Sequence, residues 1–309
     1  MSAVEKTLRG SIWIANGFVN LGMMILILLL LAFGTYAIWD SGQVHGAASP
    51  ARYQMYRPTA EGEADSFADL RTINPDVFAW LTVYGTNIDY PVVQGQNNMG
   101  YVNTDARGRH SLSGAIFLDS RSGPNFSDFS SIVYGHHMEN QVMFGEVALF
   151  ADRSYFEARR YGALYFEGRE HGLEFFAFVH ADAYDTTVFR NQITEPEERE
   201  AYLDMLLQMA IHTRPDVPVT VNDRIVLFST CTPDATNGRD ILIGKITDGV
   251  PGDPFRREQA ESAIPIPGVD LLPGLWVGAG LWVQIGIVVL VFLLILSAVV
   301  LVYTRKQRR

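Results

Sequence analysis

The sequence predicts a mainly β fold with a few helices: a closed or nearly closed mixed barrel of about eight strands, flanked by two transmembrane helices. Short segments of alternating apolar and polar residues, bounded by turn residues, recur through the middle of the chain. Few segments there have helical spacing, and one long apolar run lies near each end. Closure is the natural arrangement for so many short strands because it removes exposed strand edges.

Composition and charge narrow the function classes. The 309 residues fit one large domain or two ordinary ones, and 48% apolar and 19% charged residues argue against global disorder. The net charge of −10 argues against a nucleic-acid binder, which usually needs a basic face. Cys231 is the single cysteine, which excludes an intrachain disulfide and a multi-cysteine zinc site.

The first apolar run predicts a transmembrane helix at 18–39, within a stretch from Gly10 to Trp39 that contains no Asp, Glu, Lys, Arg or His. The alternative is a cleaved signal peptide, for which Ala47-Ala48-Ser49 is a weak cleavage site. The apolar region of a signal peptide usually has about 7–15 residues. The length of the run therefore favours an uncleaved anchor.

The second apolar run predicts a transmembrane helix at 281–303. Trp282 and Tyr303 lie at its edges, where aromatic rings favour the membrane interface, and a basic cluster follows at 305–309. A buried core helix is the alternative, but it does not explain the basic cluster. Because Lys6 and Arg9 also precede the first span, both termini are expected on the cytoplasmic side and the middle of the chain on the exterior face of the cell membrane.

These spans divide the chain into seven segments. They are a cytoplasmic N-terminus (1–17), a transmembrane helix (18–39), an exterior stalk (40–64), a compact domain (65–248), a Pro/Gly-rich tether (249–280), a transmembrane helix (281–303) and a basic cytoplasmic tail (304–309).

Within the compact domain, turn residues separate the predicted strands. A short helix is expected from Asp65 or Ser66 to Arg71, and Asn74-Pro75 has the pattern of another helix start. Thr194-Glu195-Pro196-Glu197 reads as a capping box for a helix that ends near His212. The expected strands are 79–84, 88–93, 114–119, 131–134, 163–167, 173–184, 220–222, 224–230 and 240–246.

Cys231 is the first candidate for chemistry because it follows the predicted strand 224–230 and precedes a turn. A lone cysteine is often a small buried hydrophobe, but one unpaired thiol in an exterior domain is a candidate nucleophile. Such a nucleophile needs a base and a positive neighbour that favour the thiolate.

His136 and Arg239 are the candidates for those two groups. The pair His136-His137 follows the predicted strand 131–134, and Arg239 opens the strand after Cys231. A guanidinium there can stabilise developing oxyanion charge. The alternatives are surface loop histidines and an ordinary surface arginine. Metal binding is poorly supported because adjacent histidines point in different directions, so no metal and no other cofactor is expected.

Several blocks, in order, resemble the sortases, and specifically class B. They cover about residues 66–248. The blocks are the opening strands 80–95, the segments 101–105 and 113–119, the histidine block Ile132-Val-Tyr-Gly-His-His-Met138 with Met143-Phe144-Gly145, the signature Ser229-Thr-Cys-Thr232, and the arginine block Asn237-Gly-Arg-Asp-Ile-Leu242. Any one block is weak, but all of them in order are a strong signal. The resemblance implies an eight-stranded sortase-type β-barrel.

The resemblance also implies a cysteine transpeptidase. Cys231 would be the nucleophile, His136 the acid/base and Arg239 the oxyanion and positioning group, and Ser229 and Thr230 would line the substrate groove. The substrates would be surface proteins with a C-terminal sorting signal, cleaved at a Thr–X bond through a thioester. The acceptor would be an amine of a cell-wall precursor or a pilin lysine.

One feature departs from class B, whose members usually have only the N-terminal anchor. The second span is more similar to class C, the pilin polymerases, although the aspartate-aromatic lid of that class is not evident here. Two alternatives stay open. One is a cysteine peptidase that only hydrolyses. The other is a membrane-tethered binding module with an inert Cys231, in which Cys231, His136 and Arg239 would lie far apart.

Overall fold

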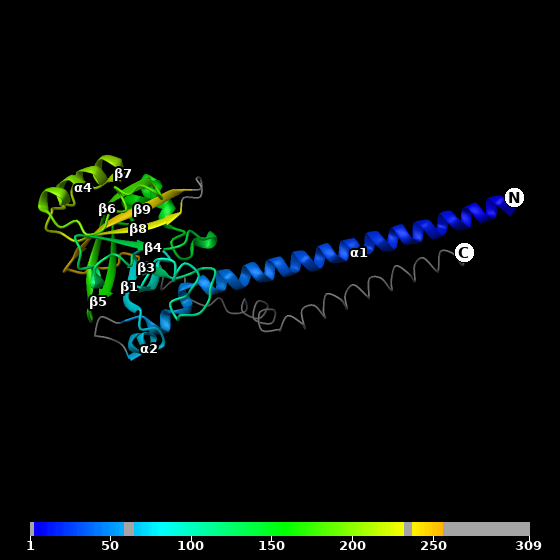
Figure 1. Ribbon diagram of the computed structural model, residues 1–309, viewed down its shortest axis with the longest axis horizontal. Helices are drawn as coiled ribbons and strands as arrows, with labels where there is room; N and C mark the ends of the chain where they lie inside the picture. The colour runs from blue at the N-terminus through cyan, green and yellow to red at the C-terminus, as the bar shows by residue number, and fades with distance from the viewer. Residues whose placement is uncertain (1–2, 59–64, 232–236, 256–309) are drawn as a thin grey trace. The chain divides into compact units, whose positions relative to one another are not determined.

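The computed structural model describes residues 3–58, 65–231 and 237–255, and Figure 1 shows its helices and strands. The helices are α1 (Ala3–Ala48), α2 (Asp65–Ile73), α3 (Arg153–Ala158) and α4 (Pro196–Met209). The strands are β1 (Val77–Val83), β2 (Asp89–Val93), β3 (Ile116–Leu118), β4 (Ser130–Tyr134), β5 (Tyr161–Phe166), β6 (Arg169–Asp182), β7 (Ala210–Thr213), β8 (Ile225–Cys231) and β9 (Gly238–Thr247). Short 3₁₀ turns join several of them.

The strands form a closed mixed barrel, as the sequence predicts. Their order is β5-β1-β2-β3-β4-β8-β9-β6-β7, and an additional β5–β6 pairing closes the first eight into a ring. The short β7 pairs with β6 beside this ring. The pairs β2–β3 and β4–β8 are parallel, while the other ladders are antiparallel. The β4–β8 ladder joins segments that lie almost a hundred residues apart in the sequence.

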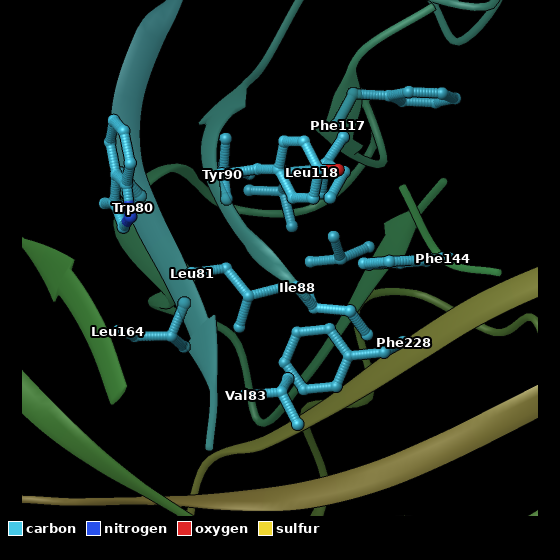
Figure 2. Close-up of a cluster of buried hydrophobic side chains, with 14 of the residues drawn as sticks. Trp80, Leu81, Val83, Ile88, Tyr90, Phe117, Leu118, Phe144, Leu164 and Phe228 are labelled. Carbon is cyan, nitrogen blue, oxygen red and sulfur yellow. The ribbon is translucent and has the colours of Figure 1, made fainter. Parts of the chain in front are cut away.

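The alternation of side chains along the strands produces two apolar clusters. One cluster contains Val226 and Phe228 of β8 and Leu242 of β9, together with residues of β1, β2 and β5. Figure 2 shows part of it, in which rings such as Phe228 and Phe144 lie among aliphatic side chains of several strands. The second cluster contains the alternate residues Leu227 and Ile241, packed against α4. The first cluster therefore fills the barrel, and the second lies between its outer face and α4.

The N-terminal segment differs from the predicted stalk at 40–64. Helix α1 contains the predicted span 18–39 and continues to Ala48. Its candidate span is Ala15–Ala48, within which an 18-residue window has a mean hydropathy of 2.4, and among the described residues it is the one helix long and apolar enough to cross a membrane. Tyr53 and Tyr56 then bury their rings in the first cluster, and Arg107 stacks over both. Buried aromatic area holds this segment on the domain, so residues 48–56 are part of it.

Three local predictions were wrong. Asn74-Pro75 forms a turn, because the Asn74 side chain accepts from the Asp76 N–H and its carbonyl accepts from the Val77 N–H. The second wrong prediction concerns α4. It begins after Glu195, which makes no side-chain capping bond, so the predicted capping box is not formed. It ends at Met209 and not near His212, because residues 210–213 pair with β6 as β7.

The third is the strand expected at 220–222, which is also a turn: the Asp223 carboxylate accepts from the Thr220 N–H and hydroxyl. Most of the predicted tether (249–280), and all of the second span (281–303) and the tail (304–309), lie outside the described residues.

Candidate active site

The candidate site lies where β4 and β8 end and β9 begins. The parallel β4–β8 ladder places Tyr134 beside Ser229, and the Gly135 N–H extends the ladder by donating to the Ser229 carbonyl at 3.2 Å. His136 follows Tyr134 by two residues, and Cys231 follows Ser229 by two residues. The backbone register therefore places positions 136 and 231 at the same end of neighbouring strands.

Arg239 reaches the same end from β9. The antiparallel β8–β9 ladder pairs Cys231 directly with Arg239. Directly opposed residues share one face of a sheet, so position 231 and Arg239 lie on the face that also carries Leu227 and Ile241. Arg239 is half-buried, and its Nη1 donates to the Gly238 carbonyl at 3.0 Å. The register thus places the three predicted positions at adjoining strand ends, whereas the binding-module alternative expects them far apart.

Two segments hold the half-buried His136. Its Nε2 lies 2.8 Å from the Val102 carbonyl oxygen, and its own carbonyl accepts from the Phe144 N–H at 3.0 Å. His137, the other member of the pair, forms an isolated bridge with Met143 instead. The two histidines therefore have different environments, and only the first has its ring fixed by a hydrogen bond to the 101–115 segment.

Ser229 and Thr230 are 1% and 2% exposed, and neither hydroxyl has a partner among the described residues. Because they are consecutive in a strand, they lie on opposite faces. Ser229 shares the outer face with position 231, while Thr230 lies on the interior face with Phe228. The alternation therefore places the two hydroxyls on different faces, and the expectation that both line one substrate groove stays a prediction.

A buried ionic group beneath β4 was missed from the sequence. The Tyr134 hydroxyl donates to Asp119 at 3.1 Å, and Arg121 forms an ion pair with the same carboxylate at 2.8 Å. Burial alone would raise the pKa of Asp119, but hydrogen bonds from Arg121 bring the pKa below its ordinary value. Burial also raises the pKa of Tyr134, which keeps its hydroxyl protonated as a donor. The Asp-x-Arg spacing at 119–121 was the available signal.

The loop 183–195 between β6 and α4 lies beside these residues. It begins next to β9, where the Ala183 N–H donates to the Asn237 carbonyl at 2.8 Å. Further along, the ring of Phe189 stacks on Tyr134 with the centroids 6.3 Å apart. The Tyr202 hydroxyl of α4 donates to the Val188 carbonyl at 2.6 Å. This loop therefore packs beside the end of β4 and the start of β9.

A close contact between a histidine and a carboxylate lies behind Arg239. His180 Nδ1 is 2.5 Å from the carboxylate of Asp240, which is 1% exposed and paired with Thr230 in the ladder. Alternation places this carboxylate on the interior face, away from Arg239. Within the described ranges, no group of three or more His, Cys, Asp or Glu side chains is arranged to hold a metal ion.

A closed barrel that carries a cysteine, a histidine and an arginine at adjoining strand ends defines a cysteine-dependent acyl-transfer enzyme. Comparison with known proteins refines that class. No family model matches the chain. The chain is 30% identical to sortase B of Listeria monocytogenes over 184 residues, which is 59% of this chain and 74% of the relative. It is 27% identical to sortase B of Staphylococcus aureus over 243 residues, 74% of this chain and 96% of the relative.

Solved structures of similar proteins belong to the same family as these two relatives. Sortase B from the type II pilus of Streptococcus pneumoniae is 48% identical, with a TM-score of 0.52 over 59% of this chain and 99% of that one. Sortase B of Clostridium perfringens is 35% identical, with a TM-score of 0.56 over 59% and 100%. A class B sortase of Streptococcus pyogenes involved in pilus biogenesis is 40% identical, with a TM-score of 0.53 over 58% and 97%. The chain belongs to the class B sortases and is a sortase-type cysteine transpeptidase.

Proposed function

We propose that this chain is a membrane-anchored transpeptidase that cleaves a C-terminal sorting signal at a Thr–X bond and transfers the protein to an amine. The observation that carries the proposal is the convergence of positions 136, 231 and 239 at one end of β4, β8 and β9. A nucleophile, a proton carrier and a cation are the three groups that acyl transfer through a thioester needs.

In the first half-reaction, the thiolate of Cys231 attacks the threonine carbonyl and forms the C–S bond. Arg239 stabilises the negative charge that develops on the carbonyl oxygen, because its backbone is held in the β8–β9 ladder and its guanidinium is already oriented by the Gly238 carbonyl. The C–N bond then breaks. His136, as imidazolium, gives its proton to the leaving amine, and a thioester remains.

In the second half-reaction, the acceptor amine attacks the thioester carbonyl. His136 takes the proton from the attacking nitrogen, Arg239 again stabilises the oxyanion, and the C–S bond breaks to return the thiolate. An amide replaces the original peptide bond. Ser229, whose buried hydroxyl shares the face of position 231, contributes a donor or acceptor for the bound signal.

Anchoring supports this role because it places the enzyme and a tail-anchored substrate on one surface, which raises their effective concentration. Helix α1 is the proposed first span, with the N-terminus on the cytoplasmic side according to Lys6 and Arg9. The second span at 281–303 and the basic tail at 304–309 complete a proposed two-pass topology, with the barrel on the exterior face.

The acceptor is an amine of a cell-wall precursor or the side chain of a pilin lysine. Two similar class B sortases, at 48% and 40% identity, carry pilus descriptions. Of the two acceptors, we therefore favour the pilin lysine. A peptidase that only hydrolyses uses the same first half-reaction, so only the product of the second half-reaction separates the two functions.

The test uses the full chain in detergent micelles, because residues 48–56 pack on the barrel and a fragment that begins at Asp65 would lack them. A panel of fluorogenic sorting-signal peptides is incubated with and without a lysine-containing peptide or a wall-peptide amine, and mass spectrometry follows the products. We expect an amine-linked product that disappears in Cys231→Ala. Hydrolysed peptide alone with every acceptor would support the peptidase. Activity that survives Cys231→Ala would overturn the proposal.

A further inference from the structure

The hydrogen bond between His136 and Val102 has a chemical consequence. Nε2 of His136 lies 2.8 Å from the backbone carbonyl oxygen of Val102. A carbonyl oxygen can only accept, so Nε2 must carry the hydrogen. In a neutral imidazole the other nitrogen then holds the lone pair. The bond therefore selects one of two tautomers and leaves Nδ1 as the nitrogen that can gain or lose a proton.

The position of the Val102 carbonyl depends on the close approach of the backbone at Gly114 to residues 101 and 102. Gly114 has φ +59°, and a Cβ built on it would lie 2.6 Å from the carbonyl oxygens of both Tyr101 and Val102. Both contacts are with backbone atoms, which cannot rotate away as a flexible side chain can. The neighbouring Ala115 N–H donates to the Tyr101 carbonyl at 3.1 Å, which fixes the two strands of this loop against each other. Only glycine at position 114 leaves the Val102 carbonyl where His136 meets it.

We propose that Gly114 and Val102 are positioning residues for proton transfer. The missing side chain of Gly114 lets the Val102 carbonyl hold His136 as the Nε2–H tautomer, so that Nδ1 carries the proton to and from the reacting nitrogen. The inference rests on the proposed acid/base role of His136 and adds to it which ring nitrogen acts and what fixes that choice.

The choice of nitrogen fits both half-reactions. When His136 is an imidazolium, the Nδ1–H bond breaks as the leaving amine takes that proton, while the Nε2–H stays bonded to Val102. When the acceptor amine attacks, its proton forms a new bond with Nδ1, and the ring is an imidazolium again. The same bond thus keeps the ring in one orientation through both half-reactions.

Gly108 offers a matched control in the same loop. It too has a positive φ, +76°, but no atom lies within 4 Å of the position that its Cβ would take. Gly108→Ala therefore introduces the same left-handed backbone strain as Gly114→Ala without displacing a carbonyl. Any difference between the two variants reports on the displacement of Val102.

The experiment is ¹⁵N NMR of the full chain in micelles with labelled histidine, and His136→Gln identifies the signals of His136. At a pH high enough for the imidazole of His136 to be neutral, we expect a protonated Nε2 and an unprotonated Nδ1 in the parent and in Gly108→Ala. Gly114→Ala is expected to show a mixture of tautomers. Its kcat/KM is expected to fall roughly 10- to 100-fold, mostly in kcat.

The outcomes separate this inference from the proposed function. A proton on Nδ1 in the neutral ring of the parent would overturn the inference by itself, even if Gly114→Ala fails to fold. A folded Gly114→Ala with the parent's tautomer and the parent's kcat would also overturn it. Full transpeptidation by His136→Gln would instead remove His136 from the proposed mechanism, whatever its tautomer.

Discussion

Cys231 and Arg239 are directly opposed in the antiparallel β8–β9 ladder. Residues opposed in this way have their Cβ atoms about 4.5–5.5 Å apart, so the backbone alone brings the guanidinium-bearing residue close to position 231. The β4–β8 ladder brings His136 to the same end of the sheet by register. Positions 231 and 239 therefore lie in paired strands, which place functional groups more precisely than loops do, while His136 follows the end of β4 by two residues.

The first prediction concerns Arg239. We expect Arg239→Ala to lower kcat/KM about 10²- to 10³-fold, the usual effect of removing one oxyanion donor, with a smaller change in KM. Arg239→Lys should recover part of this loss, because an ammonium keeps the charge without the planar fork. Steady-state kinetics with a sorting-signal peptide measure the effect.

Arg169→Ala is the matched control, because the Arg169 side chain is 58% exposed and pairs with an exposed Asp248. It should keep the parent's kcat/KM. An Arg239→Ala variant that is as active as this control would remove Arg239 from the mechanism.

The second prediction concerns Tyr90, whose hydroxyl joins the end of α1 to the segment after His136. It donates to the Ala48 carbonyl at 2.9 Å and accepts from the Met143 N–H at 3.0 Å. Burial raises the pKa of Tyr90, so the hydroxyl stays protonated. Tyr90→Phe leaves two buried backbone groups unpaired and should lower the free energy of unfolding by about 1–3 kcal/mol.

Urea unfolding of the full chain measures this loss. Tyr184→Phe removes a hydroxyl from a side chain that is 78% exposed and should leave the unfolding midpoint unchanged. Equal midpoints for the two variants would show that the bridge through Tyr90 contributes nothing to stability.

The strands were largely predictable from sequence because each has its own alternation and turn residues. The barrel order was not predictable from alternation, since the β4–β8 pairing joins segments far apart in the chain. Cys231, His136 and Arg239 could be named because each falls at a strand end. Asp119 and Tyr134 were missed because the hydrogen bond between them exists only after β3 and β4 have paired.

Local patterns failed where tertiary contacts decided the outcome. The helix expected to reach His212 ends earlier, because pairing with β6 satisfies the backbone of 210–213. The composition of 40–64 predicts an extended stalk, but this segment contains Tyr53 and Tyr56. Their burial against the barrel outweighs the local preference for an extended linker.

The third prediction concerns Asp119 and pH. The unfolded carboxyl has a pKa near 3.8, and hydrogen bonds from Arg121 outweigh burial and hold the folded pKa lower. A lowered acid pKa adds stability that is fully present above the unfolded value and is lost as pH falls through the folded value. The advantage of the parent over Asp119→Asn in free energy of unfolding should be constant near neutral pH and shrink below pH 3.8.

Denaturant unfolding over a pH series measures this difference. Asp204→Asn changes an exposed carboxylate of α4 and should differ from the parent by a small, constant amount. If the gap between the parent and Asp119→Asn keeps its size at the lowest pH at which both fold, the ionised carboxylate is not what stabilises this group.

The fourth prediction concerns His171, which is 1% exposed and stacks on Phe166 with the ring centroids 3.9 Å apart. Neither ring nitrogen has a hydrogen-bond partner within the described part of the chain. Burial, and then the positive charges of Arg169 and Arg224, lower the pKa of His171 from its ordinary 6.5. The folded protein therefore holds this ring neutral.

As pH falls below 6.5, the unfolded chain binds a proton at this histidine that the folded chain does not. The stability that His171 contributes is therefore present above pH 6.5 and is lost as pH falls from 6.5 towards the folded pKa. His171→Leu keeps an apolar side chain against Phe166 and cannot be protonated. Its free energy of unfolding should fall less than that of the parent between neutral pH and about pH 5.

Urea unfolding at several pH values in this range tests the difference in slope. His110→Gln removes an exposed histidine and should keep the parent's slope. A slope in His171→Leu as steep as in the parent would mean that other groups cause the acid sensitivity. Each of the two variants loses one histidine, but only His171 is buried. A shallower slope in His171→Leu and not in His110→Gln would therefore assign the acid sensitivity to the buried imidazole of His171.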